Sequence, residues 1–335
     1  MKNGRHFIIP ILLLTALLYL FPDSVFAERK AGVGAAHILS ECFVDAKEGF
    51  AAGLRGTIFH TANGGMNWEK QEISTDAPLL SISFCNSKTG WVGGKSGTIF
   101  KTEDGGKTWE KQSLPKQRHV FAVKALTPQK CWAIGDWGAI FYTQDGGKIW
   151  EDKTLPEDLI LYSIDFKGED IGWIAGEYGT ILHTVDGGIN WTNQTSGTIN
   201  TLFDISFSSQ QQGVAVGLSN TILRTEDGGS TWQNAEMDTS SNQQGKPQSL
   251  YSVKLRDNNG IAVGDRGWII TTNDSGKTWK VLPVPLDASL FWFADVELLD
   301  GTKAIMVGMR SVCIMIEDNH LKLMGFMPDI VPNKK

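Results

Sequence analysis

The stretch Gly94-Lys-Ser-Gly-Thr-Ile-Phe-Lys-Thr-Glu-Asp-Gly-Gly-Lys-Thr-Trp109 recurs, with small changes, through most of the 335-residue chain. The tryptophan that closes each copy recurs at intervals of 41, 41, 41, 41 and 47 residues. These tryptophans are Trp68, Trp109, Trp150, Trp191, Trp232 and Trp279. A fixed period of this length is typical of one supersecondary unit copied around a closed ring or along a stack. The period therefore decides the architecture, and the positions that differ between copies become the candidates for function.

Each copy has the pattern of four short antiparallel strands. In the copy around Gly94, residues 80–84 alternate apolar and polar side chains, which is the period of a half-buried strand. Residues 91–94, 98–102 and 108–112 are the next three expected strands, and turns rich in glycine, asparagine and aspartate separate them. Four-stranded sheets set around a channel are the blades of a β-propeller.

Counting the Gly-x-x-Gly turns predicts an all-β, seven-bladed β-propeller with four antiparallel strands in each blade. The turns begin at Gly53, Gly94, Gly135, Gly176, Gly217, Gly264 and Gly308. Asn220 replaces the last glycine of the fifth turn, and asparagine tolerates the left-handed backbone better than other residues with a side chain. A single domain at 28–335 is expected, with blades at about 36–76, 77–117, 118–158, 159–199, 200–246, 247–287 and 288–328.

The first 27 residues have the pattern of a secretory signal peptide. Lys2 and Arg5 precede an apolar run at residues 7–21, and Val25-Phe26-Ala27 is an acceptable small-residue cleavage site. We expect cleavage after Ala27 and export to the periplasm, or to the thylakoid lumen of a photosynthetic organism. The alternative is an uncleaved anchor, although the apolar run is short for a membrane span of about 20 residues.

Composition argues against several classes of function. A net charge of −6 disfavours nucleic-acid binding, which depends on basic patches. No His-rich metal motif, phosphate loop or Gly-x-Ser-x-Gly occurs, so we expect no metal and no cofactor. We also expect a monomer. No cysteine belongs to a Cys-x-x-Cys pair, and the disulfide state of all four stays open: Cys42, Cys85, Cys131 and Cys313.

The segment Thr-x-Asp-Gly-Gly-x-x-Trp is an Asp-box, and we expect it to be structural. Its carboxylate can accept hydrogen bonds from turn amides, and its tryptophan can bury a large apolar surface. Near-identical residues in six blades point in six directions and cannot converge on one substrate. The aspartates concerned are Asp104, Asp145, Asp186, Asp227 and Asp274, and the tryptophans are the six that define the period.

The variable residues inside the Gly-x-x-Gly turns are the candidate binding residues. Resemblance to known propellers implies that these turns and the blade-to-blade loops share one face around the channel mouth, while the Asp-boxes lie on the opposite face. Arginine and large aromatic side chains on such turns are favoured at interfaces. The candidates are Arg55, Lys95, Asp136, Trp137, Glu177, Tyr178, Asp265, Arg266 and Arg310, together with Lys116 and Arg118 from a blade-to-blade loop.

The combination of Gly-x-x-Gly-Thr-Ile with an Asp-box at a 41-residue step resembles the photosystem II stability/assembly factor family of seven-bladed propellers. The resemblance implies a non-enzymatic assembly factor that binds newly made reaction-centre protein at the lumenal or periplasmic membrane face, through an arginine-rich patch. Arg55, Arg266 and Arg310 occupy equivalent turns in neighbouring blades and are the candidates for that patch. The expected partner is therefore a protein or peptide, in particular a membrane-protein segment.

An Asp-box glycoside hydrolase or carbohydrate-binding propeller is the alternative. A sialidase-type site needs an arginine cluster, a tyrosine with a nearby glutamate, and an acid, and arginines are few in this chain. Asp136 and Glu177, on neighbouring blades, are a carboxylate pair that suits a glycoside hydrolase if their separation is right. The sequence does not set that separation, and we expect a binding protein rather than an enzyme.

Overall fold

The computed structural model describes residues 37–238, 248–283, 292–300, 303–309, 312–317 and 320–326. Within these ranges the regular elements are β-strands and single turns of 3-10 helix. The expected signal peptide, its cleavage site and Arg310 lie outside the described residues. No helix in the described ranges is long and apolar enough to cross a membrane.

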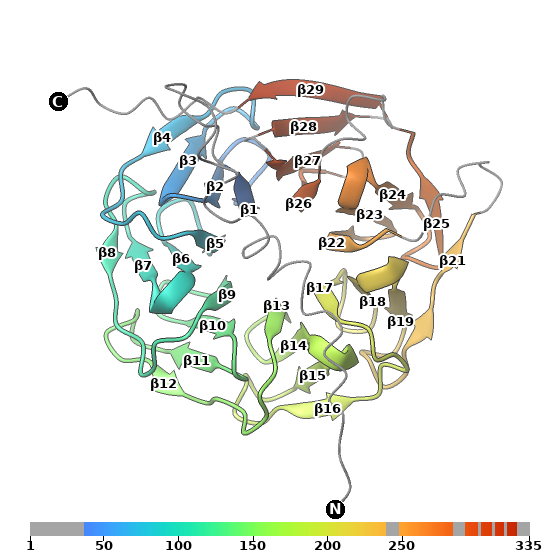
Figure 1. The fold of residues 1–335 in the computed structure, drawn as a ribbon, viewed down its shortest axis with the longest axis horizontal. Coiled ribbons are helices and arrows are strands. Elements are labelled where there is room, and N and C mark those ends of the chain that lie inside the picture. Colours follow the sequence, from blue (N-terminus) through green and yellow to red (C-terminus); the bar gives the residue numbers. More distant parts are fainter. Residues whose placement is uncertain are drawn as a thin grey trace, which may run out of the picture. The chain divides into compact units, whose positions relative to one another are not determined.

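Seven sheets, each with four consecutive antiparallel strands, form the seven blades of the predicted propeller (Figure 1). Blade 1 consists of β1 (Ile38–Phe43), β2 (Gly49–Gly53), β3 (Thr57–Thr61) and β4 (Glu69–Gln71). Blade 2 consists of β5 (Leu79–Phe84), β6 (Gly90–Gly94), β7 (Ile99–Thr102) and β8 (Glu110–Lys111). Blade 3 consists of β9 (Val120–Ala125), β10 (Cys131–Gly135), β11 (Ile140–Thr143) and β12 (Glu151–Asp152).

The remaining blades repeat this order. Blade 4 consists of β13 (Leu161–Lys167), β14 (Ile171–Gly176), β15 (Ile181–Thr184) and β16 (Thr192–Gln194), and blade 5 of β17 (Leu202–Phe207), β18 (Gly213–Gly217), β19 (Ile222–Thr225) and β20 (Gln233–Asn234). Blade 6 consists of β22 (Leu250–Arg256), β23 (Asn259–Gly264), β24 (Ile269–Thr272) and β25 (Thr278–Val281), and blade 7 of β26 (Phe293–Leu298), β27 (Lys303–Gly308), β28 (Val312–Glu317) and β29 (His320–Phe326). Four 3-10 turns lie between second and third strands: η2 (Lys95–Gly97), η3 (Glu177–Gly179), η4 (Leu218–Asn220) and η5 (Asp265–Gly267).

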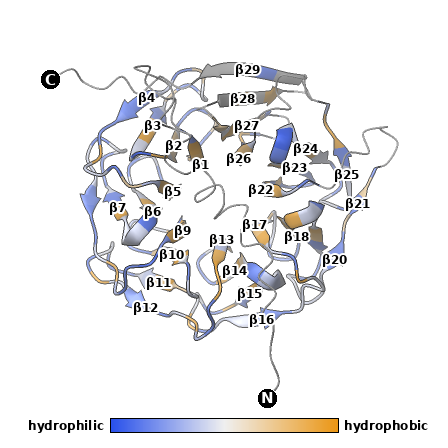
Figure 2. Cartoon of the chain, viewed as in Figure 1, coloured by the Kyte–Doolittle hydropathy of each residue, from blue (hydrophilic) through white to orange (hydrophobic). Residues whose placement is uncertain are grey.

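The second strand of a blade is buried on both faces, because a neighbouring blade covers each face. All five residues of β6 are buried, and the glycines in this strand leave room for larger neighbours. A Cβ added to Gly90 would lie 2.5 Å from the ring of Phe84. Apolar residues accordingly concentrate in the inner strands, and the outermost strands β4, β8, β12 and β16 are polar (Figure 2).

The innermost strands contact one another in sequence order around the axis, and the last contacts the first, so the ring is closed. The contacting pairs are β1–β5, β5–β9, β9–β13, β13–β17, β17–β22, β22–β26 and β26–β1. Side chains from one inner strand bond to the backbone of the next. The Ser81 hydroxyl accepts a hydrogen bond from the Val123 N–H at 3.0 Å, for example. At the closing seam, between blades 7 and 1, Asp295 Oδ2 accepts from the Glu41 N–H at 2.9 Å.

The closing seam contains an unusual buried charge. Glu41 occupies the strand position at which the other six inner strands carry isoleucine or valine: Ile82, Val123, Ile164, Ile205, Val253 and Val296. Glu41 is only 4% exposed, and neither of its carboxylate oxygens forms a well-aligned hydrogen bond with a described residue. Burial, together with the nearby carboxylates of Asp295 and Glu297, raises the pKa of Glu41 well above its ordinary value.

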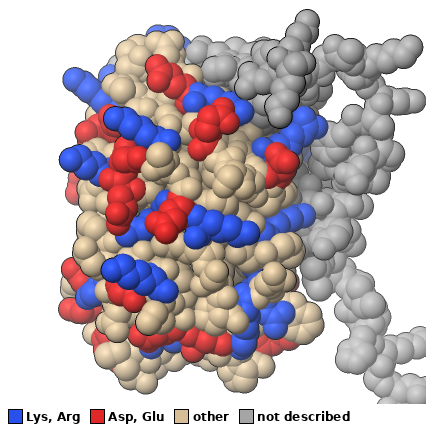
Figure 3. Space-filling model, turned by 90° about the vertical axis from the view of Figure 1, so that its left-hand side faces the viewer, with Lys and Arg blue, Asp and Glu red and all other residues tan. Residues whose placement is uncertain are grey.

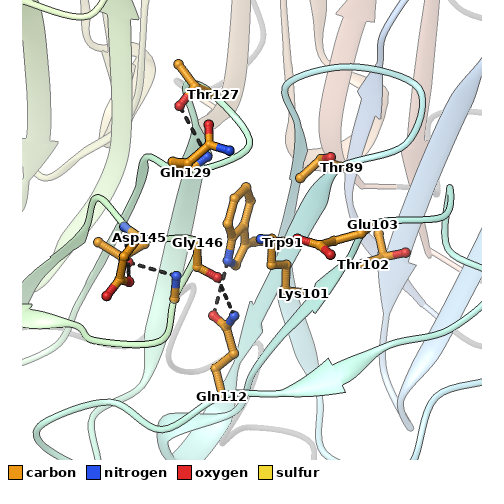
Figure 4. Close-up of polar contacts among 12 residues, drawn as sticks. Thr89, Trp91, Lys101, Thr102, Glu103, Gln112, Thr127, Gln129, Asp145 and Gly146 are labelled. Atoms are coloured by element: carbon orange, nitrogen blue, oxygen red, sulfur yellow. Dashed lines mark hydrogen bonds and ion pairs between the residues drawn. The ribbon is translucent and has the colours of Figure 1, made fainter.

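Neighbouring blades are also joined near their outer edges, as the contact between blades 2 and 3 illustrates (Figure 4). Gln112 Oε1 accepts hydrogen bonds from the indole N–H groups of Trp91 and Trp150, each at 3.2 Å. Its amide donates to the carbonyl of Gly146 at 2.9 Å. One glutamine side chain therefore satisfies two largely buried indoles and fixes the next blade's Asp-Gly-Gly turn against its own blade.

Part of the longer segment between Trp232 and Trp279 forms an additional strand in the sheet of blade 6. β21 (Glu236–Met237) pairs in parallel with β25, the outer strand of blade 6. Its backbone continues the pairing, since the Asp238 N–H donates to the Trp279 carbonyl at 2.8 Å. The start of the insertion is therefore a fifth strand of blade 6 rather than a loop, and residues 239–247 lie outside the described ranges.

Candidate binding face

Six of the seven Gly-x-x-Gly turns are described, and all six place their second variable residue in the left-handed backbone region. The φ angles lie between 51° and 59°, at Arg55, Ser96, Trp137, Tyr178, Ser219 and Arg266. Residues with a Cβ are uncommon in this region because of steric crowding. All six side chains are exposed. The turn therefore directs one side chain outward at the same place in each of these blades.

Hydrogen bonds tie these turns to the connectors between blades. The Gly97 N–H donates to the carbonyl of Arg118 at 2.7 Å. The Asp-Gly-Gly turns are tied instead to the hairpins between first and second strands, since the Gly105 N–H donates to the Lys88 carbonyl at 2.9 Å. The Gly-x-x-Gly turns and the connectors thus share one face of the ring, which we name the loop face. Figure 1 shows η2, η3, η4 and η5 around the axis on this face.

The second variable residues include the largest exposed side chains of the loop face. Trp137 is 52% exposed and Tyr178 is 66% exposed. Arg55 and Arg266 are also exposed, and neither forms an ion pair with another described residue. Blade 7 separates these two arginines around the ring, and Arg310, which belongs to blade 7, lies outside the described residues.

Asp136 and Glu177, which are first variable residues, were expected to be available for contact with a partner. Their carboxylates instead turn inward. Asp136 Oδ1 accepts a hydrogen bond from the His119 N–H at 2.8 Å, and Glu177 Oε2 accepts from the Ile160 N–H at 2.9 Å. Glu177 is only 7% exposed, and burial raises its pKa and that of Asp265. These carboxylates attach the turn to the connector beneath it, so they are less accessible than their neighbours.

The expected basic residues of the loop face are partly engaged within the chain. Lys116 Nζ lies 2.8 Å from a carboxylate oxygen of Asp152. The Arg118 guanidinium lies 5.2 Å from the centre of the Trp137 ring, which is the geometry of a cation–π contact. Burial lowers the pKa of Lys95, which is half-buried beside its turn. Arg118 and Trp137 are thereby brought together, although they stand 19 residues apart in the sequence.

The aspartates of the opposite face hydrogen-bond within their own turns. Asp186 Oδ1 accepts from the Asn190 N–H at 2.9 Å, and Oδ2 accepts from the Asn190 amide at 2.8 Å. The backbone N–H and side chain of Asn190, with the Thr184 hydroxyl, hold the pKa of Asp186 at about 2. Equivalent bonds to the N–H four residues on are made by Asp104, Asp145, Asp227 and Asp274. Trp68, Trp150 and Trp279 of these turns are buried, whereas Trp109, Trp191 and Trp232 are half-buried.

Other chemistries find little support in the described ranges. No group of three or more His, Cys, Asp or Glu side chains in those ranges is placed to hold a metal ion. Cys42, Cys85 and Cys131 are free thiols, and the side chain of Cys313 is outside what the structure describes. Lys124 of the inner strand β9 and Asp165 of the inner strand β13 form an ion pair of 2.8 Å.

Three exposed connector residues of the loop face were not among the sequence candidates. Glu157 and Asp158 lie between blades 3 and 4, and Ile199, which is 85% exposed, lies between blades 4 and 5. The signal for them is present in the repeat, because connectors 154–160 and 195–201 occupy equivalent positions and differ in charge. Whether such residues are exposed depends on how the connector packs, which the period alone does not predict.

Comparison with protein families finds a match along most of the chain. The family described as photosynthesis system II assembly factor YCF48 matches residues 33–154, 108–196 and 191–308. The chain belongs to the YCF48 family. No curated protein matches it.

Solved structures of YCF48 proteins have the same fold. "YCF48 bound to D1 peptide" is 21% identical and has a TM-score of 0.68, and the match covers 85% of this chain and 94% of that chain. YCF48 from Cyanidioschyzon merolae is 19% identical with a TM-score of 0.69, over 86% of this chain and 97% of that one. At these identities the likeness concerns the fold, and membership of the YCF48 family rests on the family match.

Enzymes share this fold as well. The GH74 xyloglucanase from Xanthomonas campestris is 10% identical with a TM-score of 0.70, and the match covers 89% of this chain and 56% of that chain. The propeller fold therefore does not by itself distinguish a binding protein from a glycoside hydrolase.

Proposed function

We propose that this member of the YCF48 family is an exported, non-enzymatic scaffold that binds a peptide segment of a membrane protein through its loop face. The observation that carries the proposal is the set of exposed arginine and aromatic side chains on left-handed turns around one face. Such side chains account for much of the binding energy at protein interfaces. A relative of the same fold has been solved with a D1 peptide bound, which supports a peptide as the ligand.

The arginine side of the face is the part best suited to an acidic segment or a carboxylate. Arg55 and Arg266 are exposed and form no ion pair with any other residue that the structure describes. In the sequence repeat, Arg310 has the equivalent position in the blade between them. Guanidinium groups bind carboxylates through paired hydrogen bonds, and several together raise the local concentration of an acidic ligand.

Export is the second part of the proposal. The pattern of residues 1–27 supports a signal peptide cleaved after Ala27 and delivery to the periplasm, or to the thylakoid lumen if the organism is photosynthetic. A monomer at that membrane face would meet newly inserted membrane proteins. A photosystem II protein is the partner that the family name favours.

A pull-down from detergent-solubilised membranes of the source organism tests the proposal. The bait is the wild-type protein or the variant Arg55→Glu/Arg266→Glu/Arg310→Glu. We expect a membrane protein captured by the wild type to be reduced at least about tenfold with the variant, since it reverses several interface arginines. A matched control, Lys107→Glu/Lys148→Glu/Lys277→Glu, reverses three charges on the opposite face and should capture the same protein. Undiminished capture by the arginine variant would contradict the proposal.

A glycoside hydrolase is the second candidate, because GH74 enzymes share the fold and Asp136 and Glu177 stand on neighbouring blades. Both carboxylates are bonded to backbone N–H groups, which suits a structural role better than catalysis. Release of reducing sugar from xyloglucan by the wild type, and its loss in Glu177→Gln, would replace the scaffold proposal with this one.

A further inference from the structure

Two bulky aromatic residues occupy left-handed positions on adjacent blades of the loop face. Trp137 has a φ of 56°, and Tyr178 has a φ of 55° with a ψ of 31°. The equivalent turns of blades 2 and 5 carry Ser96 and Ser219 in the same conformation, so the fold does not require an aromatic side chain there. Strained residues of this kind persist mostly where function needs the side chain. Both rings are more than half exposed, so packing does not explain them either.

Backbone hydrogen bonds hold both aromatic turns against one connector, residues 154–160. The Gly138 N–H, next to Trp137, donates to the Leu159 carbonyl at 2.7 Å. The Glu177 N–H, next to Tyr178, donates to the carbonyl of the following residue, Ile160, at 3.0 Å. The two turns therefore flank the same short segment, and Trp137 and Tyr178 stand on either side of it.

The segment between the two turns is acidic. Glu157 and Asp158 are exposed. They directly precede Leu159 and Ile160, whose carbonyls accept the hydrogen bonds from the aromatic turns. Neither takes part in an ion pair with any residue of the described ranges. The next connector, residues 195–201, carries no charged residue and exposes Ile199. This side of the loop face therefore combines aromatic rings with two exposed carboxylates that form no ion pair among the described residues.

Trp137 already contacts one cation within the chain, since the Arg118 guanidinium lies 5.2 Å from its ring centre. This contact shows that the ring stands where a guanidinium can reach it, while half of its surface remains exposed. Aromatic rings attract Lys and Arg side chains through their faces, and nearby carboxylates strengthen that preference.

We propose that Trp137, Tyr178, Glu157 and Asp158 form a subsite for a basic peptide segment, whose Lys or Arg side chains contact the rings while the two carboxylates balance their charge. The subsite deepens the proposed function, since it assumes that the loop face binds a peptide. It lies across the ring from Arg55 and Arg266, which favour an acidic segment. The partner is accordingly a segment with an acidic part and a basic part separated by the channel mouth.

Fluorescence anisotropy with two labelled synthetic decapeptides tests the subsite: one with alternating Lys and Gly, and one with alternating Glu and Gly. The protein is used as the wild type, as Trp137→Ser/Tyr178→Ser and as Glu157→Gln/Asp158→Asn. Serine is the matched replacement because Ser96 and Ser219 already occupy equivalent turns. Thermal melting by circular dichroism confirms that each variant is folded. Arg55→Glu/Arg266→Glu is the control for the other side of the face.

The basic peptide should bind the wild type, and each of the two subsite variants should weaken it at least about tenfold, as expected for loss of desolvated cation–π contacts or of their counter-charges. The arginine control should not weaken basic-peptide binding, and it should weaken binding of the acidic peptide instead. No binding of the basic peptide, or equal binding by the folded serine variant, would overturn the subsite. Loss of acidic-peptide binding in the arginine control would then still support the proposed function, so the two failures are distinguishable.

Discussion

The two variable residues of a Gly-x-x-Gly turn have opposite environments because the turn gives them different backbone conformations. The second residue has a positive φ and an exposed side chain, as at Tyr178. The first directs a carboxylate back to the connector, as at Glu177. Where the first residue is Asp136 or Glu177, it stabilises the turn, and the second residue is the one that can reach a partner.

The carboxylate of an Asp-Gly-Gly turn should contribute to stability and not to binding. In Asp104→Ala the N–H and hydroxyl of Thr108, at 2.9 Å and 2.6 Å from the carboxylate, lose their acceptors. We expect the free energy of unfolding to fall by about 1 kcal/mol, the usual net value of such hydrogen bonds. Equilibrium urea denaturation, followed by tryptophan fluorescence, measures the change.

Asparagine at the same position is the matched control, because Asn63 Oδ1 already accepts from the Asn67 N–H at 2.9 Å in the first repeat. Asp104→Asn should retain most of the stability that the alanine variant loses. If Asp104→Ala kept full stability but failed to capture the partner, the turn would be a binding element and the assignment would be wrong.

At this scale the sequence predicts backbone conformation better than side-chain direction. Asn220 in place of glycine indicates a left-handed turn, and the structure places it at a φ of 59°. The inward bonds of Asp136 and Glu177 depend on where the connector's N–H groups lie, at His119 and Ile160. That position follows from packing between blades, which a single repeat does not contain.

The inner strand β1 carries a residue that conflicts with its element. Glu41 lies where the six other inner strands have an aliphatic side chain, and β26 faces it with Asp295 and Glu297. Lys254 of β22 is the positive charge that acts in the opposite direction on the pKa of Glu41, whereas β2 and β5 bring no Asp, Glu, Lys or Arg. Lys303 begins the other contacting strand, β27. The closing seam thus buries a carboxyl group beside two others, at a position where the six other blade interfaces have an aliphatic side chain.

Replacing Glu41 with valine should stabilise the seam and remove the contribution of this carboxyl group to the pH dependence of the free energy of unfolding. The folded-state pKa of Glu41 lies above its ordinary value of 4.5, so the folded protein holds this proton more tightly than the unfolded chain. The stabilisation that results is complete below pH 4.5 and is lost as the pH rises through the folded-state pKa. At alkaline pH, Glu41→Val should be more stable than wild type by about 1–3 kcal/mol, the usual cost of a buried polar group without a partner.

Urea denaturation at mildly acidic, neutral and alkaline pH measures this difference. Glu41→Gln is the control that removes the ionisation and keeps the size of the side chain. The gap between each variant and the wild type should widen as the pH rises. If this difference in the free energy of unfolding stayed constant with pH, or became smaller, ionisation of Glu41 would not destabilise the seam.

The elements themselves were largely predictable, because their period is short and repeated. The strands expected at residues 80–84, 91–94 and 98–102 are observed as β5, β6 and β7, with bounds that differ by one residue at most. The addition of β21 to blade 6 was not predictable. Its parallel pairing with β25 depends on an insertion that occurs in only one repeat.

On the loop face, different blades of the ring carry different kinds of exposed side chain. Arginines stand on blades 6 and 1, and aromatic and acidic residues stand on blades 3 and 4, on the other side of the channel mouth. On the outer side of blades shown in Figure 3, basic and acidic side chains are interspersed. Several charged side chains of the described residues pair with each other, as Lys101 and Glu103 do at 2.6 Å. A charged partner is therefore expected to be attracted by the loop face more than by this part of the rim.

Seven blades and their order around the ring follow from counting turns in the sequence. Which exposed residues act together does not follow, because it depends on blades that meet only when the ring closes. Arg55 and Arg266 are on blades that stand far apart in the chain, and one blade separates them in the ring. The pairing of Trp137 with Arg118 likewise requires the connector that the fold places beside the turn.

Cross-linking mass spectrometry of the protein with its captured membrane partner tests the central claim most directly. Lysines occur on both faces, so an amine-reactive cross-linker reports which face is used. The account predicts cross-links to the partner from the loop-face residues Lys95 and Lys116. Cross-links confined to Lys107, Lys148 and Lys277 on the opposite face would contradict it.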